Sequence, residues 1–205
     1  FQWLNTLCDK GFGGILADEM GLGKSVQLIA LLLSRYQRNT GEMGDGSLGP
    51  SLIVCPASLV YNWGAEFTKF APSFNAVVVA GTKAERRTAI GRAFRADEPT
   101  VLITSYDLLR RDVDDYTANE QRFNVMALDE AQYIKNHTTK IAKAVKAVAA
   151  DHRFALTGTP IENRLSELWS IFDFLMPGLL GSYKRFHERY ELPISNARAA
   201  GWQHG

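Results

Sequence analysis

A chain of 205 residues, 46% of them hydrophobic, can bury the core of one domain but leaves little room for a second. The formal net charge of only +1 excludes binding to nucleic acid through overall charge, so such binding would have to come from local sites. The two cysteines and four histidines have neither disulfide nor metal-ligand spacing, and Cys8 and Cys55 are expected to be buried thiols.

The first predicted elements are a strand, a glycine-rich turn and a helix. The apolar run Gly13–Ala17 precedes a turn that ends in Gly23-Lys24-Ser25, and a helix follows from Val26 onward. The N–H groups of such a turn and the positive end of the helix attract phosphate, Lys24 adds a charge, and Ser25 offers a hydroxyl to magnesium. Asp18 stands where the general pattern has glycine. The turn indicates a site for ATP or GTP, with a purely structural turn as the alternative.

Short apolar segments alternate with helical patterns along the chain. The predicted strands are Gly13–Ala17, Ser51–Cys55, Ala76–Ala80, Thr100–Thr104, Asn124–Leu128 and Arg153–Thr157. Helical stripes lie between them, formed by Leu59, Trp63, Phe67 and Phe70, by Ile141, Ala144, Val145 and Val148, and by Leu165, Leu168, Trp169, Phe172 and Leu175. The alternation predicts an α/β fold, a three-layer sandwich with a mostly parallel sheet and helices on both faces. Residues 39–50 are expected to form a mobile loop and residues 195–205 an irregular tail.

Polar residues follow three of these strands, at the edge of the sheet where ligands bind in such folds. They are the Gly-Lys-Ser turn, Asp129-Glu130-Ala131-Gln132 and Gly158-Thr159-Pro160. Asp129 can hold magnesium, and Glu130 can orient and deprotonate the water that attacks a phosphate. The alternative is that Asp129 and Glu130 simply begin a helix, as acidic residues often do. The catalytic interpretation of the pair depends mainly on the phosphate-binding turn about a hundred residues upstream.

Six ordered motifs resemble those of the Swi/Snf-type ATPases, the double-stranded DNA translocases of helicase superfamily two. They are Gly14–Ser25, Leu52–Val60 with Asn62-Trp63, Ile103–Tyr106, Leu128–Gln132, Leu156–Asn163 and Phe174–Gly178. The resemblance runs from Phe1 to about Ile194 and accounts for Asp18, because the family itself has aspartate there. Gln132 stands where many eukaryotic members have histidine, and this difference favours a bacterial source.

The resemblance implies a RecA-like, P-loop NTPase lobe that binds ATP and magnesium. The nucleotide-binding residues would be Asp18, Glu19, Met20, Gly21, Leu22, Gly23, Lys24, Ser25 and Val26; the catalytic residues Lys24, Asp129 and Glu130; the magnesium ligands Ser25 and Asp129. Gln132, Thr157, Gly158 and Thr159 would couple nucleotide state to DNA, with Gln132 hydrogen-bonded between the acidic box and the relay. The alternative for the Thr-Gly-Thr segment is an ordinary turn.

The resemblance also implies contacts with the phosphate backbone of one strand of double-stranded DNA. The residues concerned are Pro56, Ala57, Ser58, Thr104, Ser105 and Tyr106. Ser58 and Ser105 could instead only cap helices. Trp63, Trp169 and Phe172 lie on helical stripes and are expected in the core rather than stacked on bases. Arg86, Arg87, Arg92 and Arg95 are expected on a solvated helix face, with a DNA contact as the alternative.

The chain begins at Phe1 without a methionine or signal peptide, so a fragment of a longer protein is expected. In the resembled family an adenine-reading glutamine lies upstream of Trp3-Leu4, at a position that Gln2 does not occupy, and a second motor lobe with a catalytic arginine follows. The fragment alone is therefore expected to hydrolyse ATP very slowly. Leu28–Leu33, the longest apolar run, is too short to cross a membrane.

The resemblance implies that the parent protein moves along DNA without separating its strands. Two alternatives remain open: a strand-separating helicase of the same superfamily, and a catalytically silent scaffold that binds proteins. The retention of Lys24, Asp129 and Glu130 argues against the scaffold. A bacterial source implies a cytoplasmic, nucleoid-associated protein, and a eukaryotic source a nuclear one.

Overall fold

The computed structural model describes residues 2–17, 23–39, 48–158 and 165–194. Within these ranges six strands form a single sheet in the order β1-β6-β5-β2-β4-β3. Every pair of neighbouring strands is parallel. The α/β prediction is confirmed, and the described sheet is wholly rather than mostly parallel.

The strands agree with the predicted segments except at some ends. Their bounds are β1 (Gly14–Leu16), β2 (Ser51–Cys55), β3 (Asn75–Val78), β4 (Thr100–Ser105), β5 (Phe123–Asp129) and β6 (Ala150–Leu156). The largest difference is at β6, which starts three residues before the predicted Arg153. Its polar first half is held by pairing with β5, with Ala150 opposite Phe123 and His152 opposite Val125. Hydrogen bonding to a buried neighbour thus extends a strand whose own side chains give no apolar signal.

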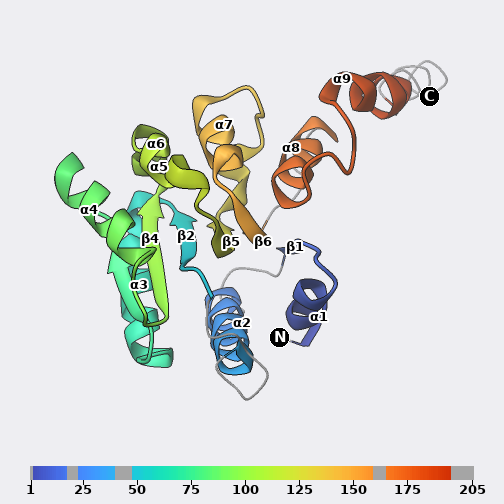
Figure 1. Cartoon of the computed structure of the whole chain (residues 1–205). Coiled ribbons are helices and arrows are strands. Elements are labelled where there is room, and N and C mark those ends of the chain that lie inside the picture. Colours follow the sequence, from blue (N-terminus) through green and yellow to red (C-terminus); the bar gives the residue numbers. More distant parts are fainter. Residues whose placement is uncertain (1, 18–22, 40–47, 159–164, 195–205) are drawn as a thin grey trace.

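The helices lie on both faces of the sheet, as Figure 1 shows for α1 and α2 below it and α7 above it. Their bounds are α1 (Gln2–Asp9), α2 (Lys24–Asn39), α3 (Val60–Phe70), α4 (Lys83–Ala93), α5 (Tyr106–Arg111), α6 (Val113–Thr117), α7 (Lys140–Ala147), α8 (Leu165–Leu175) and α9 (Tyr183–Phe186). Single helical turns are η1 (Ala57–Leu59), η2 (Ala118–Glu120), η3 (Ala131–Ile134) and the π-helical η4 (His187–Glu191).

Two hydrophobic clusters, one on each face, hold the layers together. Helices α1, α2 and α3 pack on one face against Ile53, Val125 and Ala127. Helices α4 to α8 pack on the other against Leu52, Met126 and Leu128. Because alternate residues of β2 and β5 enter opposite clusters, their segments Leu52–Cys55 and Val125–Leu128 are apolar on both faces, which is why the sequence indicates these strands so clearly.

The two cysteines are free and buried, one on α1 and one on β2. Burial raises the pKa of the Cys55 thiol to about 12, so it stays protonated and unreactive. This agrees with the predicted buried thiols. No helix in the described ranges has both the length and the apolar character that a membrane span requires.

The predicted exposure of one arginine is wrong. Arg86 was expected on a solvated helix face, but it is only 8% exposed. Its guanidinium forms a two-pronged ion pair with Asp112, with 2.9 Å between Nη2 and Oδ1, and also donates to the Gly81 carbonyl. The long aliphatic stem of arginine allows this burial, provided that the charge meets a carboxylate.

Replacing Arg86 by alanine should lower the free energy of unfolding by about 3 kcal/mol, because it leaves the Asp112 carboxylate buried without its partner. Urea denaturation followed by tryptophan fluorescence measures this. Arg87→Ala is the matched control, since the side chain of Arg87 is 77% exposed and its ion pair with Asp115 is longer, at 3.5 Å. Equal losses in the two variants would contradict the importance of the buried pair.

Candidate nucleotide-binding site

A cavity of about 540 Å³ lies at the carboxyl ends of the strands, beside the start of α2. It is lined by Gly23, Lys24, Ser25 and Val26, by Leu59, Asn62, Trp63, Ala65, Glu66, Lys69 and Phe70, and by Asp129, Glu130 and Leu156. The sheet order makes this meeting possible, because β1, β6 and β5 are adjacent and their ends share one edge. The predicted convergence of the phosphate turn and the acidic pair is therefore present.

The start of α2 is built to face an anion. Gly23 has φ of +70°, a left-handed conformation that favours glycine, and its carbonyl accepts the Gln27 N–H at 3.0 Å. Lys24 begins the helix and Ser25 follows it, so both stand at the positive end of a 16-residue helix. Val26 is exposed. The predicted residues Asp18, Glu19, Met20, Gly21 and Leu22 lie outside the described residues.

The carboxylate of Asp129 is held from two sides at the end of β5. One oxygen, Oδ2, accepts a hydrogen bond of 2.9 Å from the indole Nε1 of Trp63. The other, Oδ1, accepts the Glu130 backbone N–H at 3.0 Å. Each oxygen keeps further lone pairs for a ligand, so a single oriented carboxylate fits magnesium that takes its other ligands from phosphate and water. Nowhere in the described ranges do three His, Cys, Asp or Glu side chains cluster to make an all-protein metal site.

Burial raises the pKa of Asp129, and the charge of Glu130 adds to the rise. The hydrogen bond from Trp63 and the charge of Lys24 act in the opposite direction and favour the carboxylate. Trp63 was expected only as a core residue. It is indeed 4% exposed, but its N–H also orients the predicted magnesium ligand. The helical stripe in the sequence reveals the burial of the indole but not the direction of its N–H group.

Substitution of Trp63 by phenylalanine should raise the pKa of Asp129 further, since a hydrogen bond to the charged form is lost. A raised pKa means that the carboxylate is protonated at a higher pH. The loss of magnesium-dependent ADP binding on acidification should therefore begin at higher pH in the variant. Isothermal titration across the acid side of neutrality measures it, and an unchanged pH profile would contradict the role of Trp63.

Glu130 has an unusual backbone conformation, with φ of 53° and ψ of 57°. For a residue other than glycine the left-handed region costs on the order of 1 kcal/mol and persists where surrounding contacts impose it. Its carboxylate accepts a hydrogen bond of 2.6 Å from Nε2 of Gln132. The side chain that was predicted to act on water is thus held in one orientation at the cavity wall.

Gln132 joins the acidic pair to the end of β6. Its Oε1 accepts a hydrogen bond of 3.1 Å from the hydroxyl of Thr157, which is 1% exposed. The hydrogen bonds predicted for Gln132 are therefore confirmed, as a chain Glu130–Gln132–Thr157. The role of these three hydrogen-bonded residues in coupling the nucleotide state to DNA stays a prediction. Gly158 is exposed next to it, and Thr159 lies outside the described residues.

The predicted DNA-contacting residues fall into two groups. Ala57 and Ser58 are exposed and Pro56 is partly buried after β2, so this segment can meet a phosphate backbone. Thr104 is 0%, Ser105 5% and Tyr106 2% exposed. The Ser105 hydroxyl caps α5 by accepting the Leu108 N–H, as its alternative predicted. The core on the α5 face of the sheet encloses the side chains of Thr104 and Tyr106, and the DNA contact of this segment stays a prediction.

The remaining aromatic predictions hold. Trp169 is 7% exposed and Phe172 partly buried on α8, neither open as a stacking platform. Trp169 packs against His137 and Tyr183. Arg87, Arg92 and Arg95 are exposed on or just after α4, as predicted for a solvated face, and their possible DNA contact stays a prediction.

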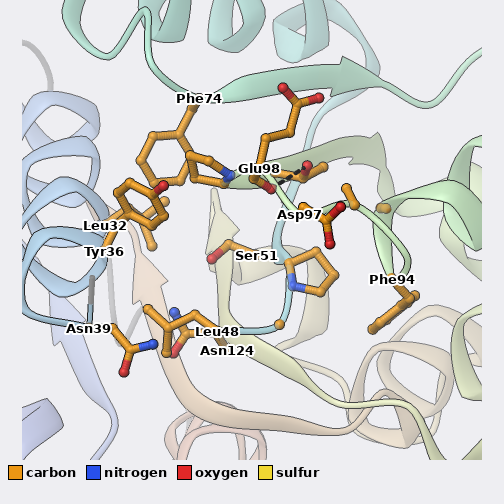
Figure 2. A pocket seen from close by; sticks show the side chains of 16 residues that line it. Leu32, Tyr36, Asn39, Leu48, Ser51, Phe74, Phe94, Asp97, Glu98 and Asn124 are labelled. Carbon is orange, nitrogen blue, oxygen red and sulfur yellow. Dashed lines mark hydrogen bonds between the residues drawn. The ribbon is translucent and has the colours of Figure 1, made fainter. Parts of the chain in front are cut away.

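A second cavity, of about 410 Å³, lies at the opposite edge of the sheet, where β2 and β4 begin. Figure 2 shows Tyr36 and Phe74 on one side of it and Phe94 on the other, with Asp97 and Glu98 at its rim. None of the predicted catalytic residues lines it. It is separate from the nucleotide cavity.

Comparison with known proteins agrees with this geometry. The SNF2-related domain model matches residues 1–204. An uncharacterized ATP-dependent helicase of Mycoplasma pneumoniae is 47% identical over 190 residues, covering 93% of this chain and 17% of the relative. The TATA-binding protein-associated factor MOT1 of Saccharomyces cerevisiae is 45% identical over 203 residues, covering 96% of this chain and 11% of the relative.

A solved structure extends the comparison to three dimensions. The Sulfolobus solfataricus SWI2/SNF2 ATPase core in complex with double-stranded DNA superposes with a TM-score of 0.80 at 39% identity, over 95% of this chain and 38% of that one. The chain therefore spans only a minor part of each of these proteins. The match of the family model along nearly its whole length shows that this chain belongs to the SNF2-related domain family.

Proposed function

We propose that this chain is the ATP-binding motor lobe of an ATP-driven translocase on double-stranded DNA. The observation that carries the proposal is the cavity in which Lys24 and Ser25, at the start of α2, face Asp129 and Glu130 at the end of β5. A protein that only binds partners has no need of an oriented acidic pair beside a phosphate-binding helix start.

In the proposed reaction the start of α2 binds the terminal phosphates of ATP. Lys24 neutralises part of their charge, and Ser25 and Asp129 would hold magnesium, which would supply further positive charge to the phosphate oxygens. Trp63 orients the Asp129 carboxylate through its 2.9 Å hydrogen bond. Glu130 accepts a proton from the attacking water, and Gln132 fixes the carboxylate that does so.

DNA binding is proposed for the exposed segment after β2. Ser58 offers a hydroxyl and the neighbouring backbone offers N–H groups, which make contacts with phosphate that do not depend on sequence. The Sulfolobus solfataricus ATPase core was solved in complex with double-stranded DNA, which supports this choice of partner. A second motor lobe of the same polypeptide would complete the site and supply an arginine for the transferring phosphoryl group.

A strand-separating helicase is the second candidate, favoured by the helicase name of the Mycoplasma pneumoniae relative. Two assays on the full-length protein distinguish the candidates. A translocase displaces the third strand of a triplex in an ATP-dependent way and leaves a fluorescently labelled duplex intact. Duplex unwinding at the rate of triplex displacement would contradict the proposal and favour the helicase.

A further inference from the structure

The backbone that carries the catalytic carboxylate is bent immediately after β5. Glu130 takes the left-handed conformation there, and three hydrogen bonds surround the bend. The Glu130 N–H donates to the Asp129 side chain at 3.0 Å, and the Glu130 carbonyl accepts the Tyr133 N–H at 3.1 Å. The third bond reaches the Asp129 carbonyl from the helix that follows β4, and it makes the bend depend on the far side of β2.

That third bond comes from Tyr106, the first residue of α5. Its hydroxyl lies 2.7 Å from the Asp129 carbonyl oxygen and 3.4 Å from that of Glu130. In the sheet, β2 lies between β4, which leads into Tyr106, and β5, which ends in Asp129. The tyrosine side chain therefore bridges the end of β2 and ties the β4–α5 turn directly to the acidic pair.

The ring of Tyr106 is covered from outside by Tyr133. The two rings are stacked, with their centroids 4.7 Å apart and an angle of 3° between their planes. Tyr106 is 2% exposed, whereas Tyr133 is 48% exposed and belongs to η3, directly after the acidic pair. Parallel, close rings restrict the tilt of the inner phenol, so the outer ring fixes where the Tyr106 hydroxyl points.

We propose that Tyr106 is a positioning residue that couples the β4–α5 turn to the backbone of Asp129 and Glu130, and that Tyr133 holds it in place. The proposal rests on the proposed function, in which the edge of the sheet beside this turn meets DNA. A shift of the turn would move the Tyr106 hydroxyl, release or strengthen the bend at Glu130, and so change how the Glu130 carboxylate faces the nucleotide cavity.

The chemistry of the phenol suits this task. Burial raises the pKa of Tyr106 well above its ordinary value, and the charge of Asp129 adds to the rise. The hydroxyl thus remains a neutral donor over the range in which the protein works. Ser105, its neighbour, caps α5 by accepting the Leu108 N–H at 3.2 Å, and this hydrogen bond fixes the start of α5 relative to the β4–α5 turn.

The test uses the full-length protein and measures kcat and KM for ATP with and without saturating duplex DNA. Tyr106→Phe removes only the hydroxyl and keeps the stacked ring. We expect kcat with DNA to fall about tenfold and the ratio of DNA-stimulated to basal rate to fall with it, while KM and duplex affinity stay unchanged. Tyr133→Ala should lower the same ratio, and because Tyr133 is half-exposed this substitution leaves the core intact. Tyr133→Phe, which keeps the stacked ring, should have the wild-type ratio.

Tyr116→Phe on α6 is the matched control, because Tyr116 is also fully buried and packs on Phe123 within the same core cluster. The proposal is overturned if Tyr106→Phe and Tyr133→Ala keep the wild-type stimulation, or if Tyr116→Phe lowers kcat as much as Tyr106→Phe does. Should Tyr106→Phe fail to fold, the Tyr133 pair of variants decides alone. A wild-type protein whose ATP turnover ignores DNA would instead overturn the proposed function, and the coupling with it.

Discussion

Replacement of Glu130 by glutamine in the full-length protein should reduce ATP turnover about a thousandfold, because an amide cannot accept the proton of the attacking water. Nucleotide binding should remain near the wild-type level, since Lys24, Ser25 and Asp129 are untouched. Steady-state hydrolysis and fluorescent ATP titration measure the two effects separately.

Glu120→Gln is the matched control for this substitution. Glu120 has the same left-handed backbone, with φ of 54°, but is exposed and follows α6, away from the nucleotide cavity. The Glu120→Gln substitution should leave ATP turnover unchanged. If Glu130→Gln hydrolysed ATP at a rate near that of the wild type, the assignment of Glu130 as the proton acceptor would be wrong.

Removal of the Lys24 side chain by Lys24→Ala should weaken ATP binding about a hundredfold, because the charge nearest the terminal phosphates is lost. Adenosine, which has no phosphates, should bind both proteins equally. This comparison separates loss of the phosphate contact from damage to the cavity, and equilibrium titration with ATP and adenosine provides it.

Lys83→Ala serves as the control, because Lys83 is the exposed first residue of α4 just as Lys24 is the first residue of α2. A helix start that lies outside the nucleotide cavity should make no difference to ATP affinity. An equal loss of affinity in the two variants would show that general surface charge, rather than the Lys24 position, attracts the nucleotide.

The sheet and the centre of the site were predictable because their signals are local. Strands β2 and β5 are buried on both faces, and each contains an unbroken apolar run, Leu52–Cys55 and Val125–Leu128. Parallel strands then bring their polar ends to one edge, which places Lys24 near Asp129 without further information. The first half of β6 could not be predicted, since Asp151 and His152 are polar and only pairing with β5 makes them strand.

The burial of Tyr106 is the feature of the site that the sequence interpretation missed. A tyrosine at the end of a strand in a DNA-contacting motif looks like a surface residue. Tyr106 is buried because its side chain extends past the end of β2, which lies between β4 and β5, to reach the Asp129 carbonyl. The residue pattern within β4 does not contain this information. The burial of Arg86 was missed for a similar reason, because its partner Asp112 lies 26 residues away, between α5 and α6.

The bend at Glu130 was also invisible in the sequence. Left-handed residues other than glycine are rare, and glutamate carries no preference that would mark one. The conformation results from contacts made by Tyr106, Gln132 and Tyr133, which come together only in the fold. The motif is sufficient to propose a catalytic role for this residue, but it does not predict how the carboxylate is oriented.

The central claim, that this chain is the ATP-binding lobe of a motor on duplex DNA, is tested most directly by ATP hydrolysis of the full-length protein as duplex DNA is added. The account predicts that turnover rises with duplex concentration to a plateau, and that Glu130→Gln abolishes the rise without abolishing ATP binding. Turnover that stays at its basal rate at saturating duplex would contradict the account.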